Sequence, residues 1–414
     1  MGLVWDPTQQ GRAKIYANYG RYFENIPLDA ANRSLSAETQ IRSNHACDPM
    51  AGHAVCDQQA NLRTGRAGGT SVFWANTGAP YPTPVDPNIK SPSTDEVVAG
   101  GEYEVIPNAR LGASYTYRNL VRTVEDMSTT GGNTYFLGNP GEGIGSTFPK
   151  ATRTYHAVTV AFNKNFSDLW LAQVSYTWSR LTGNYDGLFA PNYGPNQLDP
   201  NITAIFDFPQ FLKNGDGNLS GDITHSIKVF IAKEFVINPV FSVSLGGSVN
   251  ASSGPPIEPL GADPIYGNGI VYILQRGTTS RAPWVTSFDA KVNANFRLSK
   301  DSVITAGIEG FNLFNSQRPI LIDNNYTLDF PGPIVGATNG SIPTQYAGLC
   351  TNKDDPTTCA QGNGKLPSSK TQTLLVLLPD PSGAPTVVNT NPRWGQARTY
   401  QAVRQFRFSL KVTF

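Results

Sequence analysis

The four cysteines are the residues whose type and spacing suggest chemistry most directly. They form two pairs of identical spacing in polar stretches, Cys47 with Cys56 and Cys350 with Cys359. His45 and His53 flank the first pair, which leaves a metal site as one interpretation, but no histidine lies near the second pair. We favour two local disulfides and expect no metal. Paired cysteines of this kind indicate an oxidising compartment.

The remaining motifs do not predict an enzyme. The chain has only four histidines, none in the spacing of a catalytic triad or a zinc-hydrolase helix, and no Gly-rich loop joins a strand to a helix. Residues 214–218, with Asp222 beyond them, have the oxygen spacing of a calcium loop. That stretch begins on asparagine and has Leu219 where the loop needs glycine, so a solvated turn is the favoured interpretation. We expect no catalytic residues and no cofactor.

Two further groups of side chains suggest binding. The charged residues stand at polar positions of alternating segments: Lys291, Arg297, Glu309, Arg407 and Lys411. The aromatic residues stand in long polar connections: Phe73, Trp74, Tyr266 and Tyr272. The charged set could line a transport path and the aromatic set could hold a ligand. The alternative is that the charges pair with one another and that the aromatic rings pack within their own loops.

The elements that position these residues are strands, and the last one is the clearest. Residues 405–414 alternate apolar and polar side chains without a break, and the chain ends on Phe414 with the pattern intact. An ordinary edge strand of a soluble sheet also alternates in this way. The ending resembles the terminal strand of bacterial outer-membrane β-barrels, in which the last phenylalanine is an assembly signal.

Eleven strands are predicted in all, and no convincing helical period separates them. They are placed at 2–6, 14–22, 96–105, 110–121, 155–163, 169–181, 226–235, 241–252, 284–297, 302–314 and 400–414. The connections between them alternate strictly between short and long. Short turns on one rim and long loops on the other are the organisation of an outer-membrane barrel, and such long loops are uncommon in compact soluble domains. Both cysteine pairs fall in long connections, on the expected extracellular rim.

Length, composition and charge agree with one continuous architecture over residues 1–414. The sequence has 414 residues, with 32 basic and 31 acidic side chains, so its charge favours neither nucleic acid nor anionic lipid. Its longest strongly apolar run, 374–378, is far shorter than a membrane-spanning helix needs. The first residues lack the basic and apolar regions of a signal peptide. We therefore expect either a cytosolic protein or a sequence whose true beginning is missing.

Several stretches resemble the C-terminal half of TonB-dependent outer-membrane transporters, most closely the Oar-like branch. The residues that carry the resemblance are 2–7, 16–22, 92–96, 101–104, 175–179, Asp222 with His225 and Lys228, Arg276-Gly277 with Arg281, Pro283 and Trp284, 311–315, and Phe414. Where the family often has arginine after the aspartate of its Asp-x-x-His element, this chain has Ile223. No role is carried over for that position.

The resemblance implies an antiparallel transmembrane β-barrel in the cell outer membrane, with about eleven strands of a 22-stranded barrel present. Full members also have a signal peptide and a plug domain, which we do not find in residues 1–414. The implied partners are outer-membrane lipid, the barrel assembly machinery that reads Phe414, the TonB system acting through the plug, and an unknown extracellular ligand. The implied function is ligand binding at the extracellular loops and translocation through the barrel. The alternative is a non-transporting surface protein, either an adhesin or a structural barrel.

Overall fold

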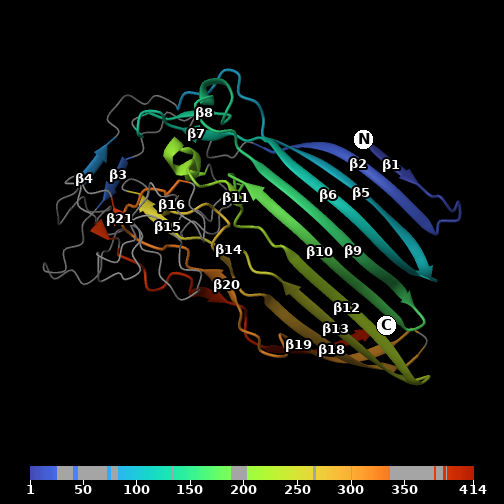
Figure 1. The fold of residues 1–414 in the computed structure, drawn as a ribbon. Helices are drawn as coiled ribbons and strands as arrows, with labels where there is room; N and C mark the ends of the chain where they lie inside the picture. Colours follow the sequence, from blue (N-terminus) through green and yellow to red (C-terminus); the bar gives the residue numbers. More distant parts are fainter. Residues whose placement is uncertain are drawn as a thin grey trace, which may run out of the picture.

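The computed structural model describes residues 1–25, 41–44, 72–75, 83–132, 134–187, 203–263, 267–299, 301–335, 377–378, 386–387 and 389–414. Eleven long strands form one curved antiparallel sheet (Figure 1). They are β1 (Gly2–Trp5), β2 (Ala13–Phe23), β5 (Ser93–Ile106), β6 (Ala109–Arg122), β9 (Arg153–Ser167), β10 (Trp170–Gly183), β12 (His225–Asn238), β13 (Phe241–Ser252), β18 (Val285–Arg297), β19 (Val303–Phe311) and β24 (Gln405–Thr413). The eleven predicted strands are confirmed.

The sheet follows chain order from β1 to β24, with a short strand, β11 (Gly217–Asn218), added beside β10. Within the described residues, β1 pairs only with β2, and β24 pairs only with β19. These two strands are therefore the edges of an open sheet that does not close on itself in this structure.

Short turns and long loops lie at opposite ends of the sheet (Figure 1). The short connections are 6–12, 107–108, 168–169, 239–240 and 298–302, and the long ones are 24–92, 123–152, 184–224, 253–284 and 312–404. The tightest turns have backbone conformations suited to hairpins. Asp168 and Leu169 both have positive φ, 54° and 63°, as a two-residue turn between twisted strands requires. The predicted alternation of turn and loop lengths is confirmed.

The strands bury few of their side chains. All nine residues of β24 are exposed, and its apolar members Phe408 and Leu410 are 76% and 75% exposed. Apolar side chains are exposed on other strands too, such as Leu245 on β13 and Val292 on β18, and large exposed apolar patches mark surfaces that contact a protein or a membrane. Among the described residues, no helix combines the length and the apolar character needed to cross a bilayer.

The buried core lies in the long loops instead, which form small elements at one end of the sheet (Figure 1). These are β3 (Ile41–Asn44), β4 (Val72–Ala75), β7 (Glu125–Met127), β8 (Phe136–Gly138), η2 (Gly143–Gly145), η3 (Ala204–Phe206), η4 (Pro209–Leu212), β14 (Pro256–Ile257), β15 (Leu260–Asp263), β16 (Gly267–Tyr272), β17 (Ser280–Arg281), β20 (Pro319–Ile322), β21 (Leu377–Leu378), β22 (Thr386–Val387) and β23 (Ala397–Tyr400). We call the described parts of the five long connections the loop layer. Its main cluster includes Met127, Phe206, Phe208, Phe211 and Leu260, none of which is more than 1% exposed.

Five predicted boundaries differ from the structure by three residues or more. The strands expected at 96–105, 155–163 and 226–235 are longer, as β5, β9 and β12, and two other strands are shorter than expected. The strand expected at 302–314 ends at Phe311, because Asn312 and Asn315 adopt positive φ, 48° and 51°, and the Asn312 side chain bonds the backbone of the following turn. The strand expected at 400–414 begins at Gln405. Residues 397–400 form the separate strand β23, which pairs with β20 in the loop layer.

Candidate functional site

The polar face of the last three strands brings together three of the five charged candidates. Glu309 on β19 lies in register with Lys291 on β18 and with Arg407 on β24. Its carboxylate accepts a hydrogen bond from Arg407 Nε at 2.6 Å and forms ion pairs with Lys291 and Arg407. The row carries two cations and one anion. One carboxylate therefore ties three strands together on this face.

The other two charged candidates lie on the same face near the turn end. Lys411 is in register with Thr305, and Arg297 with Val303. Both side chains are exposed, and neither takes part in an ion pair with the described residues. The structure thus combines the two interpretations of the sequence: part of the set forms ion pairs, and part presents its charge to the surroundings.

A buried ion pair joins two of the long loops. Arg276 and Asp186 meet through two contacts of 2.5 Å from Nη2, and their side chains are 1% and 3% exposed. Asp186 also accepts hydrogen bonds from the backbone and hydroxyl of Ser220, at 3.1 and 2.7 Å. Burial opposes ionisation of Asp186 most strongly, but Arg276 and Ser220 together hold its pKa below the usual value. The guanidinium also lies over the Tyr272 ring, 5.0 Å from its centroid.

Glu258 is the second buried carboxylate of this region. Its Oε1 accepts the Gly277 backbone N–H at 2.8 Å, whereas Oε2 is buried without a partner among the described residues. Burial raises the pKa of Glu258 to about 8, although the Arg276 charge and the Gly277 N–H act in the opposite direction. This carboxyl group is therefore largely protonated at neutral pH, while Asp186 is ionised.

A second ion pair completes the cluster. Arg281 pairs with Asp222 through Nη2 and donates from Nη1 to the Asp222 carbonyl at 3.0 Å. The Asp222 carboxylate in turn accepts the Leu181 backbone N–H at 2.6 Å, at the end of β10. We call Asp186, Asp222, Glu258, Arg276 and Arg281 the loop junction. It fixes the 253–284 loop against the 184–224 loop where both leave the sheet.

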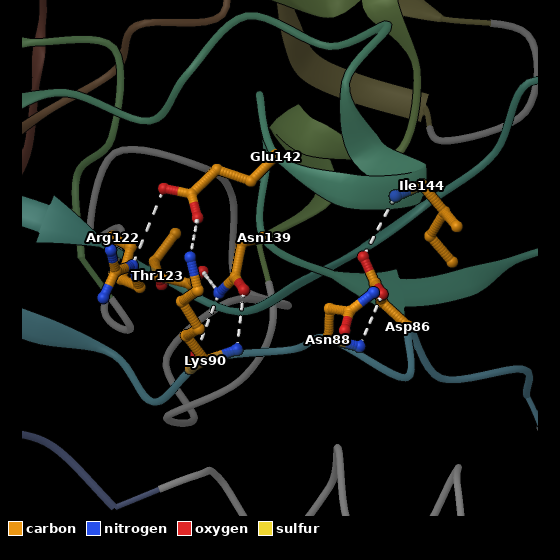
Figure 2. Close-up of polar contacts among 8 residues, drawn as sticks. All are labelled: Asp86, Asn88, Lys90, Arg122, Thr123, Asn139, Glu142 and Ile144. Carbon is orange, nitrogen blue, oxygen red and sulfur yellow. Dashed lines mark hydrogen bonds and ion pairs between the residues drawn. The ribbon is translucent and has the colours of Figure 1, made fainter.

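A third polar network anchors the segment before β5 to the 123–152 loop (Figure 2). Asp86 accepts the backbone N–H groups of Asn88 and Ile144, at 2.8 and 3.0 Å. Asn139 exchanges two hydrogen bonds with the Lys90 backbone, at 2.8 and 2.9 Å, and Glu142 forms an ion pair with Lys90. Gly143 has φ +51°, and a Cβ there would collide with the Asp86 carboxylate. Only glycine fits this turn without displacing the network.

In the stretch that resembles a calcium loop, two of the polar side chains bind other groups of the protein. Asn214 has φ 60°, and its amide donates to the carbonyls of Ile273 and Ile334 at 3.1 and 3.0 Å. Asp222 is occupied by Arg281, as described above. Within the described ranges, no three His, Cys, Asp or Glu side chains form a group that could hold a metal ion.

Five of the sequence candidates lie outside the described residues: Cys47, Cys56, Cys350, Cys359 and Tyr266. The side chains of Phe73 and Trp74 on β4 are also outside the described part of the structure. Tyr272 is described and is 3% exposed, with its ring packed against Arg276. Its ring therefore offers a ligand almost no surface. Phe414 extends beyond β24 and is 96% exposed.

Sequence reasoning missed Asp186 and Glu258. One signal was available: Arg276 follows the apolar run 270–274, and a buried arginine requires a buried carboxylate partner. It also missed Glu125, which is fully buried and accepts the Thr203 N–H at 2.8 Å. Burial and the neighbouring Asp126 raise the pKa of Glu125 well above its usual value.

Comparisons with known proteins give consistent results. A family model described as an outer membrane beta barrel domain matches residues 1–235. The chain is 39% identical over 433 aligned positions to the TonB-dependent transporter Oar of Myxococcus xanthus, which covers 100% of this chain and 38% of that protein. The chain therefore spans well under half the length of this curated relative.

Similarities to solved structures are more distant. The outer membrane transporter YddB from Escherichia coli matches with a TM-score of 0.42 and 14% identity, over 78% of this chain and 37% of that chain. The ferric-catecholate import receptor Fiu from Escherichia coli K12 matches with a TM-score of 0.39 and 13% identity, over 78% and 31%.

Proposed function

This chain belongs to the outer-membrane β-barrel domain family, and on that basis we propose that it forms part of the barrel of a TonB-dependent transporter. It lies in the cell outer membrane. The observation that carries the proposal is the 39% identity, over the whole chain, to a protein described as a TonB-dependent transporter. The open sheet supports it as well, because the two unpaired edges β1 and β24 would pair with further strands in a wider barrel.

In this proposal, residues 1–414 are the C-terminal part of the barrel, and the plug that contacts TonB lies in a part of the protein that precedes them. The assembly machinery would read Phe414 at the end of β24, and lipid would cover the apolar face that Phe408 and Leu410 present. The polar face, with Lys291, Glu309 and Arg407, would line a water-filled interior.

The loop layer would hold the extracellular ligand. Its described part is unusually well anchored for loops, since the side chains of Asp186, Asp222, Glu258 and Arg276 in the loop junction are buried and a hydrophobic cluster packs within the same layer. A packed base of this kind would reduce the conformational entropy that the described loop residues lose when a ligand binds. We therefore propose that ligand contacts come from loop residues with more exposed side chains than Tyr272.

Two measurements test transport. The coding sequence upstream of the Met1 codon should contain, in frame, a signal peptide and a plug domain. Cells that produce the complete protein should then deplete at least one solute from their growth medium, and only when their TonB protein is present. Mass spectrometry of the medium measures this depletion.

An unrelated gene directly upstream would contradict the proposal for this polypeptide. Equal solute profiles with and without TonB, together with binding of the cells to surfaces or partners through the loops, would favour the non-transporting surface protein.

A further inference from the structure

On the apolar face of the sheet, the side chains of β2, β5, β6, β9 and β10 change from apolar to polar at the same level on all five strands, near their loop ends. Strand register aligns the following three rows of side chains across these strands. The row nearest the loops is polar and consists of Arg21, Asp95, Asn119, Thr154 and Thr182. The next row toward the turns is Tyr19, Val97, Tyr117, His156 and Arg180, and below it lie Ala17, Ala99, Tyr115, Val158 and Trp178. In an outer-membrane barrel, such an aromatic boundary marks the level of the lipid headgroups, and the loop end faces outward.

Two tyrosine–histidine pairs stand at this boundary. The Tyr115 hydroxyl lies 2.7 Å from His156 Nδ1, and the Tyr176 hydroxyl lies 2.9 Å from His225 Nδ1. The His225 ring is also stacked between Tyr176 and Trp284, with centroid distances of 6.1 and 5.8 Å. With the hydroxyl as donor, each imidazole carries its proton on Nε2. Stacking fixes the orientation of the His225 ring, and the Tyr115 hydroxyl and the tilted Tyr117 ring, 5.0 Å away between centroids, orient His156. Each pair thus presents an oriented N–H donor.

Arg180 places a positive charge beside one of these pairs. It is in register with His156, its side chain is exposed, and it forms no ion pair with the described residues. The carboxylate in the polar row, Asp95, is already engaged by Arg21 through two hydrogen bonds of 2.7 and 2.8 Å. An uncompensated guanidinium at the edge of an apolar band is costly unless an anion from the surroundings meets it.

We propose that Arg180, His156 and His225 form a docking surface for the phosphate group of an outer-leaflet lipid. A guanidinium and imidazole N–H groups are matched donors for phosphate oxygens, and the aromatic rings around them suit the acyl–headgroup boundary. The apolar row of Ala17, Ala99 and Val158 beneath supplies the surface for the acyl chains. The docking surface depends only on the barrel lying in the outer membrane and would exist whether or not the barrel transports.

The test uses the complete protein extracted from its outer membrane and transferred to phosphatidylcholine vesicles with or without phosphatidic acid, which carries a phosphate monoester. Native mass spectrometry counts the phosphatidic acid molecules that the protein retains. We expect selective retention by the natural protein, and a loss of about tenfold in Arg180→Gln and in His156→Gln, as removal of one charge-assisted hydrogen bond predicts. Arg180→Lys keeps the charge and should retain most of the preference.

Arg118→Gln is the matched control, because Arg118 lies on β6 on the opposite face at the same height, where it pairs with Glu96. It should leave lipid retention unchanged. Equal retention by the natural protein, Arg180→Gln and His156→Gln would overturn the proposal. So would displacement of phosphatidic acid by inorganic phosphate, because the site would then take free phosphate and not a lipid.

Discussion

Replacing Glu258 by glutamine should remove a pH-dependent loss of stability from the loop layer. Burial raises the pKa of Glu258 from its ordinary value of 4.5 to about 8 in the folded protein. Between these two values the unfolded segment releases a proton that the folded segment retains, so rising pH favours unfolding. The contribution of protonated Glu258 to the stability of the loop layer is fully present below pH 4.5. It declines between pH 4.5 and about pH 8, and above pH 8 the stability no longer changes with the ionisation of Glu258. Glutamine keeps an acceptor for the Gly277 N–H but cannot ionise.

The magnitude follows from the same pKa values. One pKa unit corresponds to about 1.4 kcal/mol, so the free energy of opening should fall by about 3 kcal/mol between pH 6 and pH 8, and by about 5 kcal/mol over the whole window. Glu125 has a pKa raised in the same direction and adds a slope of its own. The contribution of Glu258 is therefore the difference between the natural protein and the Glu258→Gln variant.

Hydrogen–deuterium exchange of the peptide that contains Gly277 measures this difference, once intrinsic exchange rates are corrected for pH. Protection should fall between pH 6 and pH 8 in the natural protein and change much less in Glu258→Gln. Glu142→Gln is the control, since Glu142 is a loop-layer carboxylate paired with Lys90 outside the loop junction, and it should leave the Gly277 slope intact. Identical slopes in the natural protein and in Glu258→Gln would refute the reasoning.

Three further predictions concern the loop junction and the last strand. Arg276→Met leaves Asp186 as an unpaired buried charge and should cost about 3–5 kcal/mol, seen as loss of exchange protection and faster proteolysis of the loop layer; unchanged protection would contradict the role of this pair. Leu410→Lys places a charge on the apolar face and should cost about 2–4 kcal/mol in the membrane, whereas Ser409→Lys on the opposite face should cost much less; equal costs by membrane fractionation and unfolding would show that β24 has no lipid face. Deleting Phe414 should leave the hydrogen bonds of the sheet intact but prevent insertion of the protein into the outer membrane. A normal amount of this variant in the membrane fraction on immunoblots would show that Phe414 is not an assembly signal.

The strands were predictable because their signal is local. Residues 405–414 alternate without interruption, and the polar and apolar faces of β24 follow that pattern. Period-2 alternation and strict alternation of connection lengths were sufficient to locate all eleven strands along the chain. The strand expected at 302–314 was predicted too long because an asparagine ends it, and the strand expected at 400–414 was predicted too long because residues 397–400 pair with β20 instead of continuing β24. Asn312 takes a left-handed conformation that an apolar–polar pattern does not encode.

The loop junction was not predictable from local pattern. Asp186 and Arg276 are 90 residues apart in sequence, and the backbone around them has no repeating period. Its pairing depends on how two long irregular loops pack over the sheet, which is decided by tertiary contacts and not by propensity. The ion-pair row on the polar face is an intermediate case. Strand alternation placed Lys291, Glu309 and Arg407 on one face, but only the register brought them into contact.

One face of this sheet should lie in lipid and the other should face water, and spin-label accessibility along β18 tests this arrangement most directly. Labels would be placed singly at Ala290, Lys291, Val292 and Asn293 in the membrane-embedded protein, with its natural cysteines, including the four in residues 1–414, replaced by serine. We expect high accessibility to oxygen at Ala290 and Val292, and high accessibility to a water-soluble nickel chelate at Lys291 and Asn293. Accessibility that does not alternate with a period of two residues would contradict it.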